Sequence, residues 1–269
     1  MFSQGVDPGL DFTDIPKIRE IYERLTRMHV YERQPYAGDL VFTAFSGSHQ
    51  DAIKKGFDAR QPGDPWQMPY LPIDPQDIGC SYEAVIRVNS QSGKSGSAWL
   101  IEQNHGLKLP RGLQQDFSQR VQQATDSDGK EMTHHALWQL FRTRYGLQAQ
   151  PALTLLDYQS ASQQDGQLSL QATLRHHGET RRLQGQGNGL LSAAASGLSA
   201  LFRQPFMIKD YHEHTLGARS DSRSVAYIRC VFPQGESYWG VGIDNDVARA
   251  SLQALCNALS AADQAGGRK

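Results

Sequence analysis

The chain has 269 residues, of which 39% are hydrophobic and 20% are charged, and its formal net charge is −1. This composition predicts a folded protein of one large domain or two ordinary ones and excludes a disordered chain. The near-zero charge argues against nucleic-acid or anionic-membrane partners, and no leader or long apolar run that would indicate secretion or membrane insertion follows Met1.

Residues 1–30 are expected to form a connection followed by a linker helix. Glycine and proline in the first ten residues discourage regular structure. Asp14 is placed to cap a helix whose apolar residues recur at three-four spacing. This spacing predicts one buried stripe, formed by Ile15, Ile18, Tyr22 and Leu25.

Residues 31–147 are expected to form mainly helical accessory subdomains. Five prolines between Ala59 and Asp77 predict an irregular crossing that large apolar side chains hold in place, namely Trp66, Tyr70 and Leu71. One helix is expected to begin near Pro110 and another at Thr133, each with a buried apolar face. The residues expected on these faces are Leu113, Phe117, Val121 and Ala124, and then Leu137, Leu140 and Phe141.

Residues 148–263 change to a period of two, which is typical of strands. Alternating leucines predict strands around residues 153–155 and 168–174, and the run 224–232 predicts a more buried strand. Two later segments return to helical spacing with apolar faces formed by Leu191, Ala194, Ala195 and Leu198 and by Leu252, Leu255, Cys256 and Leu259. Residues 264–269 are small and polar and are expected to fray.

This strand-rich part contains one pattern twice. Asp157-Tyr158 recurs 53 residues later as Asp210-Tyr211, and Gly185-Gln-Gly187 recurs 55 residues later as Gly240-Val-Gly242. Each copy reads as strands followed by a helix, and neither is large enough to bury its apolar face alone. We therefore predict an α+β fold in which helical subdomains precede a duplicated unit with pseudo-twofold symmetry, whose seam favours a small molecule.

The glycines of the first copy are a candidate binding site. The run Gly185 to Gly189 follows a strand and opens a helix, where free backbone amides and the helix dipole attract an anion. The spacing does not fit a dinucleotide fingerprint, and a tight turn explains the glycines equally well. Gly189 and Ser192 are small where the second copy has Asn245 and Asp246, so we expect the carboxylate of an amino acid to bind in the first copy.

Histidines supply the other candidates. His212 and His214 are expected to face the same way on a strand and to share a metal in a small hydrolase, although a surface or interface role is favoured. The adjacent pairs His134-His135 and His176-His177 are expected to point apart into solvent. His49 follows a strand-like run, Leu40 to Phe45, and reads either as a catalytic group or as a helix cap.

Two other features concern phosphate binding and the cellular compartment. Gly93-Lys94-Ser95 lacks the earlier glycine of a phosphate-binding loop, and we reject that reading. The cysteines are odd in number and far apart, which fits reduced thiols and a cytoplasmic protein.

Blocks of sequence along nearly the whole chain resemble one family. They are FSQGVDP from Phe2, FSGSHQDAI from Phe45, YLPIDP from Tyr70, YEAVIRVNSQSG from Tyr82, GQGNG from Gly185, DYHEH from Asp210 and YWGVG from Tyr238. The set resembles 2-isopropylmalate synthase, and the nearest likeness is to the long-chain form of fungi, actinobacteria and many proteobacteria. Such enzymes condense acetyl-CoA with 2-oxoisovalerate, and leucine inhibits them through a C-terminal domain of two βββα units.

The resemblance implies that the catalytic (β/α)8 barrel, with its divalent metal on an aspartate and a His-x-His pair, precedes the part of the family that aligns with Met1. It therefore implies no metal or other cofactor in this chain, and no turnover without a barrel. It also implies accessory catalytic roles, conditional on a barrel, for two residues of the first half. His49 would transfer or orient a proton, and Tyr82 would donate a hydrogen bond.

The same resemblance implies a leucine pocket formed by Gly187, Gly189, Leu191, Ser192, Ile208, Tyr211, Thr215, Ser222 and Ser224. Three of these positions tend to be alanine in the family but are serine here, which makes the pocket more polar. We expect a regulatory, dimer-forming portion of the enzyme that partners leucine, a second copy and a catalytic barrel. The alternative is a stand-alone amino-acid-binding module from a truncated or split gene.

Overall fold

The computed structural model describes residues 2–44, 46–82, 94–128, 132–148, 151–163, 166–217 and 222–266. The chain divides into two compact units, one formed by Met1–Leu100 and Gln114–His134 and the other by Ile101–Leu113 and His135–Lys269. Three helices, α3, α4 and α5, contribute residues to both units. Across these described ranges, no helix combines the length and the apolar character needed to cross a membrane.

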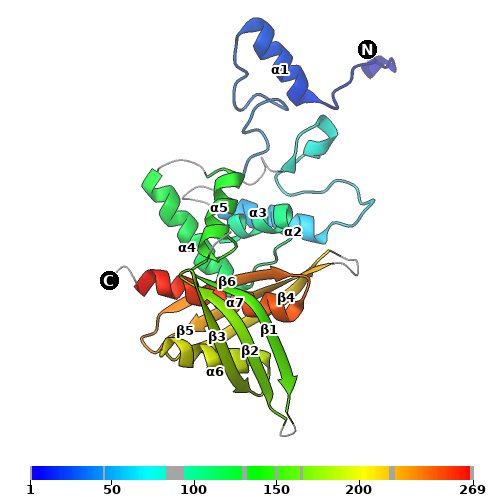
Figure 1. Ribbon diagram of the computed structural model, residues 1–269. Helices are drawn as coiled ribbons and strands as arrows, with labels where there is room; N and C mark the ends of the chain where they lie inside the picture. Colours follow the sequence, from blue (N-terminus) through cyan, green and yellow to red (C-terminus); the bar gives the residue numbers. More distant parts are fainter. Residues whose placement is uncertain are drawn as a thin grey trace. The chain divides into compact units, whose positions relative to one another are not determined.

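The second unit contains two three-stranded antiparallel sheets, each followed by a helix (Figure 1). The strand order is β1-β2-β3 in one sheet and β4-β5-β6 in the other. The first repeat consists of β1 (Leu153–Ser162), β2 (Leu168–His176), β3 (Glu179–Gly187) and α6 (Leu190–Phe202). The second consists of β4 (Met207–Leu216), β5 (Arg223–Val231), β6 (Ser237–Asp244) and α7 (Val247–Gly266). The predicted α+β class and the duplicated βββα order are confirmed.

The strand pairing aligns the residues of the two repeats differently from the glycine spacing in the sequence. A bulge follows Leu155 in β1 and Ile208 in β4, which are 53 residues apart as predicted. The later strands are shifted, because the second repeat has a longer loop before β5 and another before β6. Ala172 in β2 therefore corresponds to Ile228 in β5, at a spacing of 56.

The equivalent of Gly185 is consequently Gly242, not Gly240 as the sequence spacing suggested. A Cβ atom on Gly185 would lie 2.0 Å from the carbonyl oxygen of Ala193, and one on Gly242 would lie 2.0 Å from the carbonyl oxygen of Ala250. In each repeat a strand therefore lies directly against the backbone of the following helix. Only glycine permits an approach this close.

One apolar core is shared by the two repeats. It includes side chains from β1 and β2 of the first repeat and from β5 and α7 of the second. The predicted apolar faces of both helices point into it, and α7 is buried over most of its length because it packs on β5 and β6 and also meets β1. Each fully buried leucine contributes about 1.5–3 kcal/mol. The repeats therefore fold as one unit around α7.

Polar contacts run from β1 to α7 along the same face. Ser260 Oγ accepts from the backbone N–H of Leu153 at 2.9 Å, and Arg249 donates to the carbonyl oxygen of Leu156 at 3.3 Å. Because β1 belongs to the first repeat and α7 to the second, these bonds fasten the two repeats across their seam.

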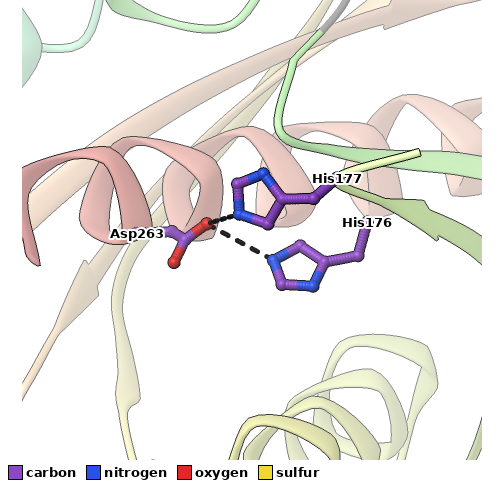
Figure 2. Close-up of side chains that lie close together, drawn as sticks. All are labelled: His176, His177 and Asp263. Atoms are coloured by element: carbon purple, nitrogen blue, oxygen red, sulfur yellow. Dashed lines mark hydrogen bonds and ion pairs between the residues drawn. The ribbon is translucent and has the colours of Figure 1, made fainter. Parts of the chain in front are cut away.

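The expectation that His176 and His177 point apart is wrong. Both imidazoles reach the carboxylate of Asp263 on α7, as Figure 2 shows. His177 has left the strand and has a φ of +48°, so the alternation of side chains along a strand no longer applies to it. With Gly178 it forms the two-residue turn that joins β2 to β3.

The first unit is built from helical elements. They are η1 (Phe2–Gln4), α1 (Ile15–Thr26), α2 (Gly47–Ala59), η2 (Pro75–Ile78) and the larger parts of α3 (Lys94–His105) and α4 (Arg111–Asp128). The last helix before the sheets, α5 (His134–Arg144), lies almost wholly in the second unit. The expected faces of α4 and α5 are confirmed, with Leu113, Phe117 and Val121 buried in one and Leu137 and Phe141 in the other.

Helix α1 has the predicted cap, because the Asp14 carboxylate accepts from the backbone N–H of Lys17 at 3.1 Å. The expected burial of its apolar stripe is wrong. No residue of this helix is buried, all of its residues being described, and Leu25 is 74% exposed. The amphipathic spacing predicted the helix but not a partner to cover it.

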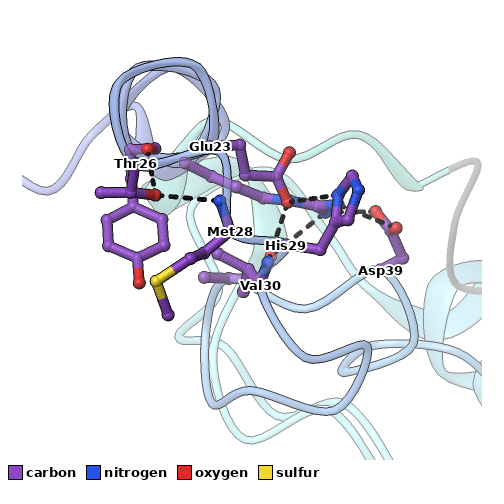
Figure 3. Close-up of polar contacts among 9 residues, drawn as sticks. Glu23, Thr26, Met28, His29, Val30 and Asp39 are labelled. Atoms are coloured by element: carbon purple, nitrogen blue, oxygen red, sulfur yellow. Dashed lines mark hydrogen bonds and ion pairs between the residues drawn. The ribbon is translucent and has the colours of Figure 1, made fainter.

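Polar bonds shape the turn that leaves α1 (Figure 3). The Glu23 carboxylate accepts from the backbone N–H of Val30 at 2.9 Å, and Thr26 Oγ1 accepts from that of Met28 at 3.2 Å. The bond from Val30 lowers the pKa of Glu23, with help from the nearby Arg19 guanidinium. The chain after α1 is thus held by hydrogen bonds rather than by packing.

Two more expectations for this unit are corrected. The run from Leu40 is not a strand, because the backbone N–H of Thr43 donates to the carbonyl oxygen of Leu40 at 3.2 Å in a turn. Phe45, the last residue of that run, lies outside the described residues, as does Gly93 of the rejected phosphate loop. The proline-rich crossing is irregular as predicted, and Trp66 Nε1 donates to the carbonyl oxygen of Leu71 at 2.7 Å. Of the side chains expected to hold it in place, Leu71 is buried, whereas Tyr70 is 61% exposed.

Replacement of the strand glycine that touches α7 should destabilise the second unit. In Gly242→Ala the new Cβ meets backbone atoms, which cannot rotate away, so the free energy of unfolding should fall by about 1–3 kcal/mol. Urea unfolding of the purified chain, followed by circular dichroism, measures this. Gly266→Ala is the matched control because nothing lies within 4 Å of its added Cβ. Equal stability of both variants would contradict the close strand–helix contact.

Candidate functional site

Four of the predicted site residues come together where β3 meets α6. Gly187 ends the strand, Gly189 is the N-cap of the helix, and Leu191 and Ser192 lie in its first turn. A Cβ on Gly187 would lie 2.6 Å from the backbone N of Ala193, so the strand end lies directly beside the first turn. Gly189 provides no side-chain cap, which leaves amides at the start of α6 without a capping group from that residue.

The same position in the second repeat carries a carboxylate. Gly189 O accepts from Ala193 N at 2.9 Å, and Asp246 O accepts from Ala250 N at the same distance, which identifies Gly189 and Asp246 as equivalents. Asp246 Oδ1 accepts from the backbone N–H of Ala248 at 2.9 Å. The chain's own anion thus occupies the start of α7.

That carboxylate is held by the other repeat. Tyr158 of β1 donates its phenolic hydrogen to Asp246 Oδ2 at 2.5 Å. The bond lowers the pKa of Asp246, with the backbone bond from Ala248 adding to the effect, and it raises the pKa of Tyr158 to about 12. Arg249 also lies over the Tyr158 ring, with its guanidinium carbon 5.8 Å from the ring centre.

The other five predicted residues lie on the β4–β5 hairpin of the second repeat. Ile208 is partly buried against the shared core, and Thr215 pairs across the hairpin with buried Ser224. The Tyr211 hydroxyl contacts Glu213 and lies 3.0 Å from Ser251 Oγ on α7. Burial raises the pKa of Tyr211, and the Glu213 carboxylate adds to the effect. The predicted residues thus form two sets, one in each repeat, and Ser222 of the second set lies immediately before β5.

A cavity of about 150 Å³ opens elsewhere in the seam between the repeats. It is called the seam cavity below, and it is lined by Leu153, His176, Phe202, Gln204, Phe206, Phe232, Leu259, Ala262 and Asp263. None of the nine residues predicted for the effector pocket is among them. Gly178, directly after His177 and between two segments of alternating pattern, is the signal from which a tight hairpin turn here could have been predicted.

The accessory candidates of the first unit have different neighbours. His49 lies in the first turn of α2, is exposed and stacks on Tyr70 with ring centres 4.1 Å apart. Tyr82 belongs to an aromatic cluster and stacks on Trp66 with ring centres 6.3 Å apart. Both residues precede α3 in the chain.

Tyr82 is fixed by a buried carboxylate. Its hydroxyl donates to Asp74 at 2.9 Å, and Asp74 also accepts from the backbone N–H of Gln76 at 3.0 Å. Burial raises the pKa of Tyr82, with Asp74 as the next cause. The phenol is therefore kept neutral and able to donate, with Arg60 3.7 Å from the same carboxylate.

The His212-Glu213-His214 run does not fit a metal centre. His214 Nε2 lies 3.1 Å from the backbone N of Lys108 and 2.9 Å from the Tyr227 hydroxyl, so this nitrogen is already used. The Glu213 carboxylate between the histidines accepts from Tyr211.

Comparison with known proteins gives two family matches. Residues 39–102 match the model described as alpha-isopropylmalate synthase, post-catalytic domain-like, and residues 131–262 match the LeuA allosteric (dimerisation) domain. The second match spans both βββα repeats as far as Ala262 in α7.

Curated relatives match along nearly the whole chain. A 2-isopropylmalate synthase of Marinomonas sp. (strain MWYL1) is 51% identical over 96% of this chain and 47% of its own length. The enzymes of Rhodospirillum rubrum and Thermobifida fusca are 48% and 44% identical, each over 98% of this chain and 48% of their own length. The chain thus spans about half the length of these relatives.

Loss of the Tyr158 hydroxyl should weaken the contact between the repeats in a pH-dependent way. Tyr158→Phe should lower the free energy of unfolding at pH 7 by about 0.5–1 kcal/mol, since both groups are accessible to solvent. The folded-state pKa of Asp246 is depressed, so the stabilisation is present above its ordinary value of 3.8 and is lost as the pH falls through the depressed value.

Urea unfolding at pH 7, 5 and 3 tests this, with exposed Tyr31→Phe as the control. The difference from wild type should shrink at the lowest pH. A difference that stays constant across this range would show that the hydroxyl does not act through the charged carboxylate.

Proposed function

Because the chain belongs to the 2-isopropylmalate synthase family, we propose that it is the regulatory and accessory portion of such an enzyme and binds leucine as a feedback inhibitor. The whole reaction would condense acetyl-CoA with 2-oxoisovalerate, the committed step of leucine synthesis. The matched domain is described as allosteric and dimerising, which supports a homodimer as the working form. We also propose a cytoplasmic location, because the three widely separated cysteines fit reduced thiols.

The contrast between the two helix starts carries the proposal. Asp246 brings a carboxylate to the start of α7, whereas Gly189 leaves the same position at α6 without one. Backbone amides and the helix dipole favour an anion there by about 0.3–1 kcal/mol or more. The carboxylate of a free amino acid would therefore occupy at α6 the place that Asp246 occupies at α7.

Apolar groups near this position suit a branched side chain. Leu191 lies in the first turn of α6 and is partly buried against the shared core, as is Ile208 on β4. An isobutyl group that joins this core would gain about 1.5–3 kcal/mol. Valine lacks one methylene and isoleucine differs in shape, so both should bind more weakly by a modest factor.

The serines set the polarity of the site. Ser192 is exposed on the first turn of α6, whereas Ser224 is buried on β5 opposite Thr215. Their hydroxyls would bind the ammonium or carboxylate of the ligand rather than its side chain. Tyr211 would form a wall of the site from β4.

The first unit would serve catalysis only beside a barrel. Tyr82, held neutral by burial and Asp74, would donate a hydrogen bond, and exposed His49 would orient or transfer a proton. We also propose that the divalent metal and the substrates bind on the barrel and not on this portion.

Leucine binding is expected to depend on the empty helix start. Isothermal titration calorimetry of the purified chain should give saturable heat with leucine and weaker binding with isoleucine and valine. Gly189→Asp should reduce leucine affinity by at least about tenfold, because its carboxylate would copy Asp246 and compete for the same amides. The backbone allows this change, since nothing lies within 4 Å of the added Cβ.

Ser196→Asp is the matched control because it adds the same charge at an exposed position of α6. It should bind leucine like wild type. No heat with leucine, or undiminished binding by Gly189→Asp, would overturn the proposed pocket.

The purified 269-residue chain should not release CoA from acetyl-CoA in the presence of 2-oxoisovalerate and Mg²⁺. A thiol-reactive dye measures the release, and the full-length relative of Marinomonas provides the positive control. Turnover by the chain on its own would place catalytic groups within it and would refute the proposal that catalysis requires the barrel.

A further inference from the structure

Three groups that bind transition metals meet at the end of the seam. His176 ends β2, His177 begins the following turn, and Asp263 lies near the end of α7. Their ligand atoms all lie within 4.8 Å of one another, and Figure 2 shows both imidazoles directed at the carboxylate. Among the described residues this is the one group of at least three His, Cys, Asp or Glu close enough to hold an ion.

The backbone conformation at His177 allows this arrangement. Two adjacent residues of a regular strand would face opposite ways, but the left-handed φ of +48° turns His177 toward the side of His176. Its backbone N–H donates to the carbonyl oxygen of Ala152 at 3.0 Å, which anchors the turn. The two ring centres lie 4.3 Å apart, and His176 also packs edge-on against Phe202.

The distances are close to those of a four-coordinate centre. Ligand bonds of about 2.0–2.1 Å in a tetrahedron separate neighbouring ligand atoms by roughly 3.4 Å. His176 Nε2 lies 3.3 Å from Asp263 Oδ2, while His177 Nε2 lies 2.6 Å from the same oxygen in a direct bond. An ion entering between them would need to displace His177 by less than about 1 Å, and a turn side chain that is 62% exposed can move that far.

The chemistry of the donors selects the kind of ion. Two imidazoles and one carboxylate suit zinc, cobalt or nickel, whereas magnesium and calcium need more oxygen ligands. We propose that His176, His177 and Asp263 bind one divalent cation of the zinc class, with its fourth position open toward the seam cavity. His176 and Asp263 both line that cavity, so water or a small anion could complete the coordination.

Such an ion would act as a clamp between the repeats. Its two imidazole ligands belong to the β2–β3 hairpin of the first repeat and its carboxylate to α7 of the second. Because binding would require the repeats to be packed together, it would stabilise the folded unit in proportion to occupancy.

Cobalt absorption tests the site without reference to activity. Tag-free chain titrated with Co²⁺ should develop the visible bands of a four-coordinate centre and saturate at one ion per chain. Zn²⁺ should displace the cobalt and raise the melting temperature, whereas Mg²⁺ should do neither.

Two variants remove ligands while preserving the backbone. His177→Asn keeps a residue that tolerates the left-handed turn, and Asp263→Asn keeps the size of the side chain. Each should weaken Zn²⁺ binding by about tenfold or more, whereas exposed His135→Ala should leave it unchanged. Absence of saturable binding, a six-coordinate cobalt spectrum, or full affinity in both ligand variants would overturn the proposal.

Discussion

The close approach of strand and helix backbones, which glycine alone permits, determines the arrangement of the second unit. A Cβ on Gly185 or Gly242 would overlap a carbonyl oxygen of the following helix at 2.0 Å. With the strands seated this closely, α6 and α7 each begin directly beside a strand end. The same packing buries α7 against strands of both repeats. The close contact between strand and helix thus accounts both for the shared core and for the position at which each helix begins.

The two repeats share this packing, but the starts of α6 and α7 differ in their chemistry. At α7 the chain supplies Asp246, which Tyr158 of the other repeat holds in place. At α6 the equivalent residue is Gly189 and offers no side chain. The two helix starts thus differ at one residue, and under the proposed function a ligand at α6 would influence contacts that cross the seam. Inhibition would then be a coupling free energy between this position and a distant catalytic site.

The sequence predicted what depends on local pattern and missed what depends on packing partners. Alternation of leucines predicted β1 and β2, and Asp14 predicted the start of α1. The burial of α1 could not be predicted, because helical periodicity shows which face is apolar and not whether anything covers it. The glycine correspondence was wrong by two residues since loop lengths between the repeats are invisible to simple spacing. The meeting of His177 with Asp263 was missed because it depends on a left-handed turn and on a helix far along the chain.

Leucine binding at the start of α6 is tested most directly by backbone amide NMR spectra of the isotopically labelled chain, recorded with increasing leucine. The two helix starts serve as internal comparisons within one molecule. We expect the largest shifts at the first turn of α6, from Leu190 to Ala193, and little change at the first turn of α7, from Val247 to Ala250. The largest shifts at α7 or around the seam cavity, or no shifts at all, would contradict leucine binding at the start of α6.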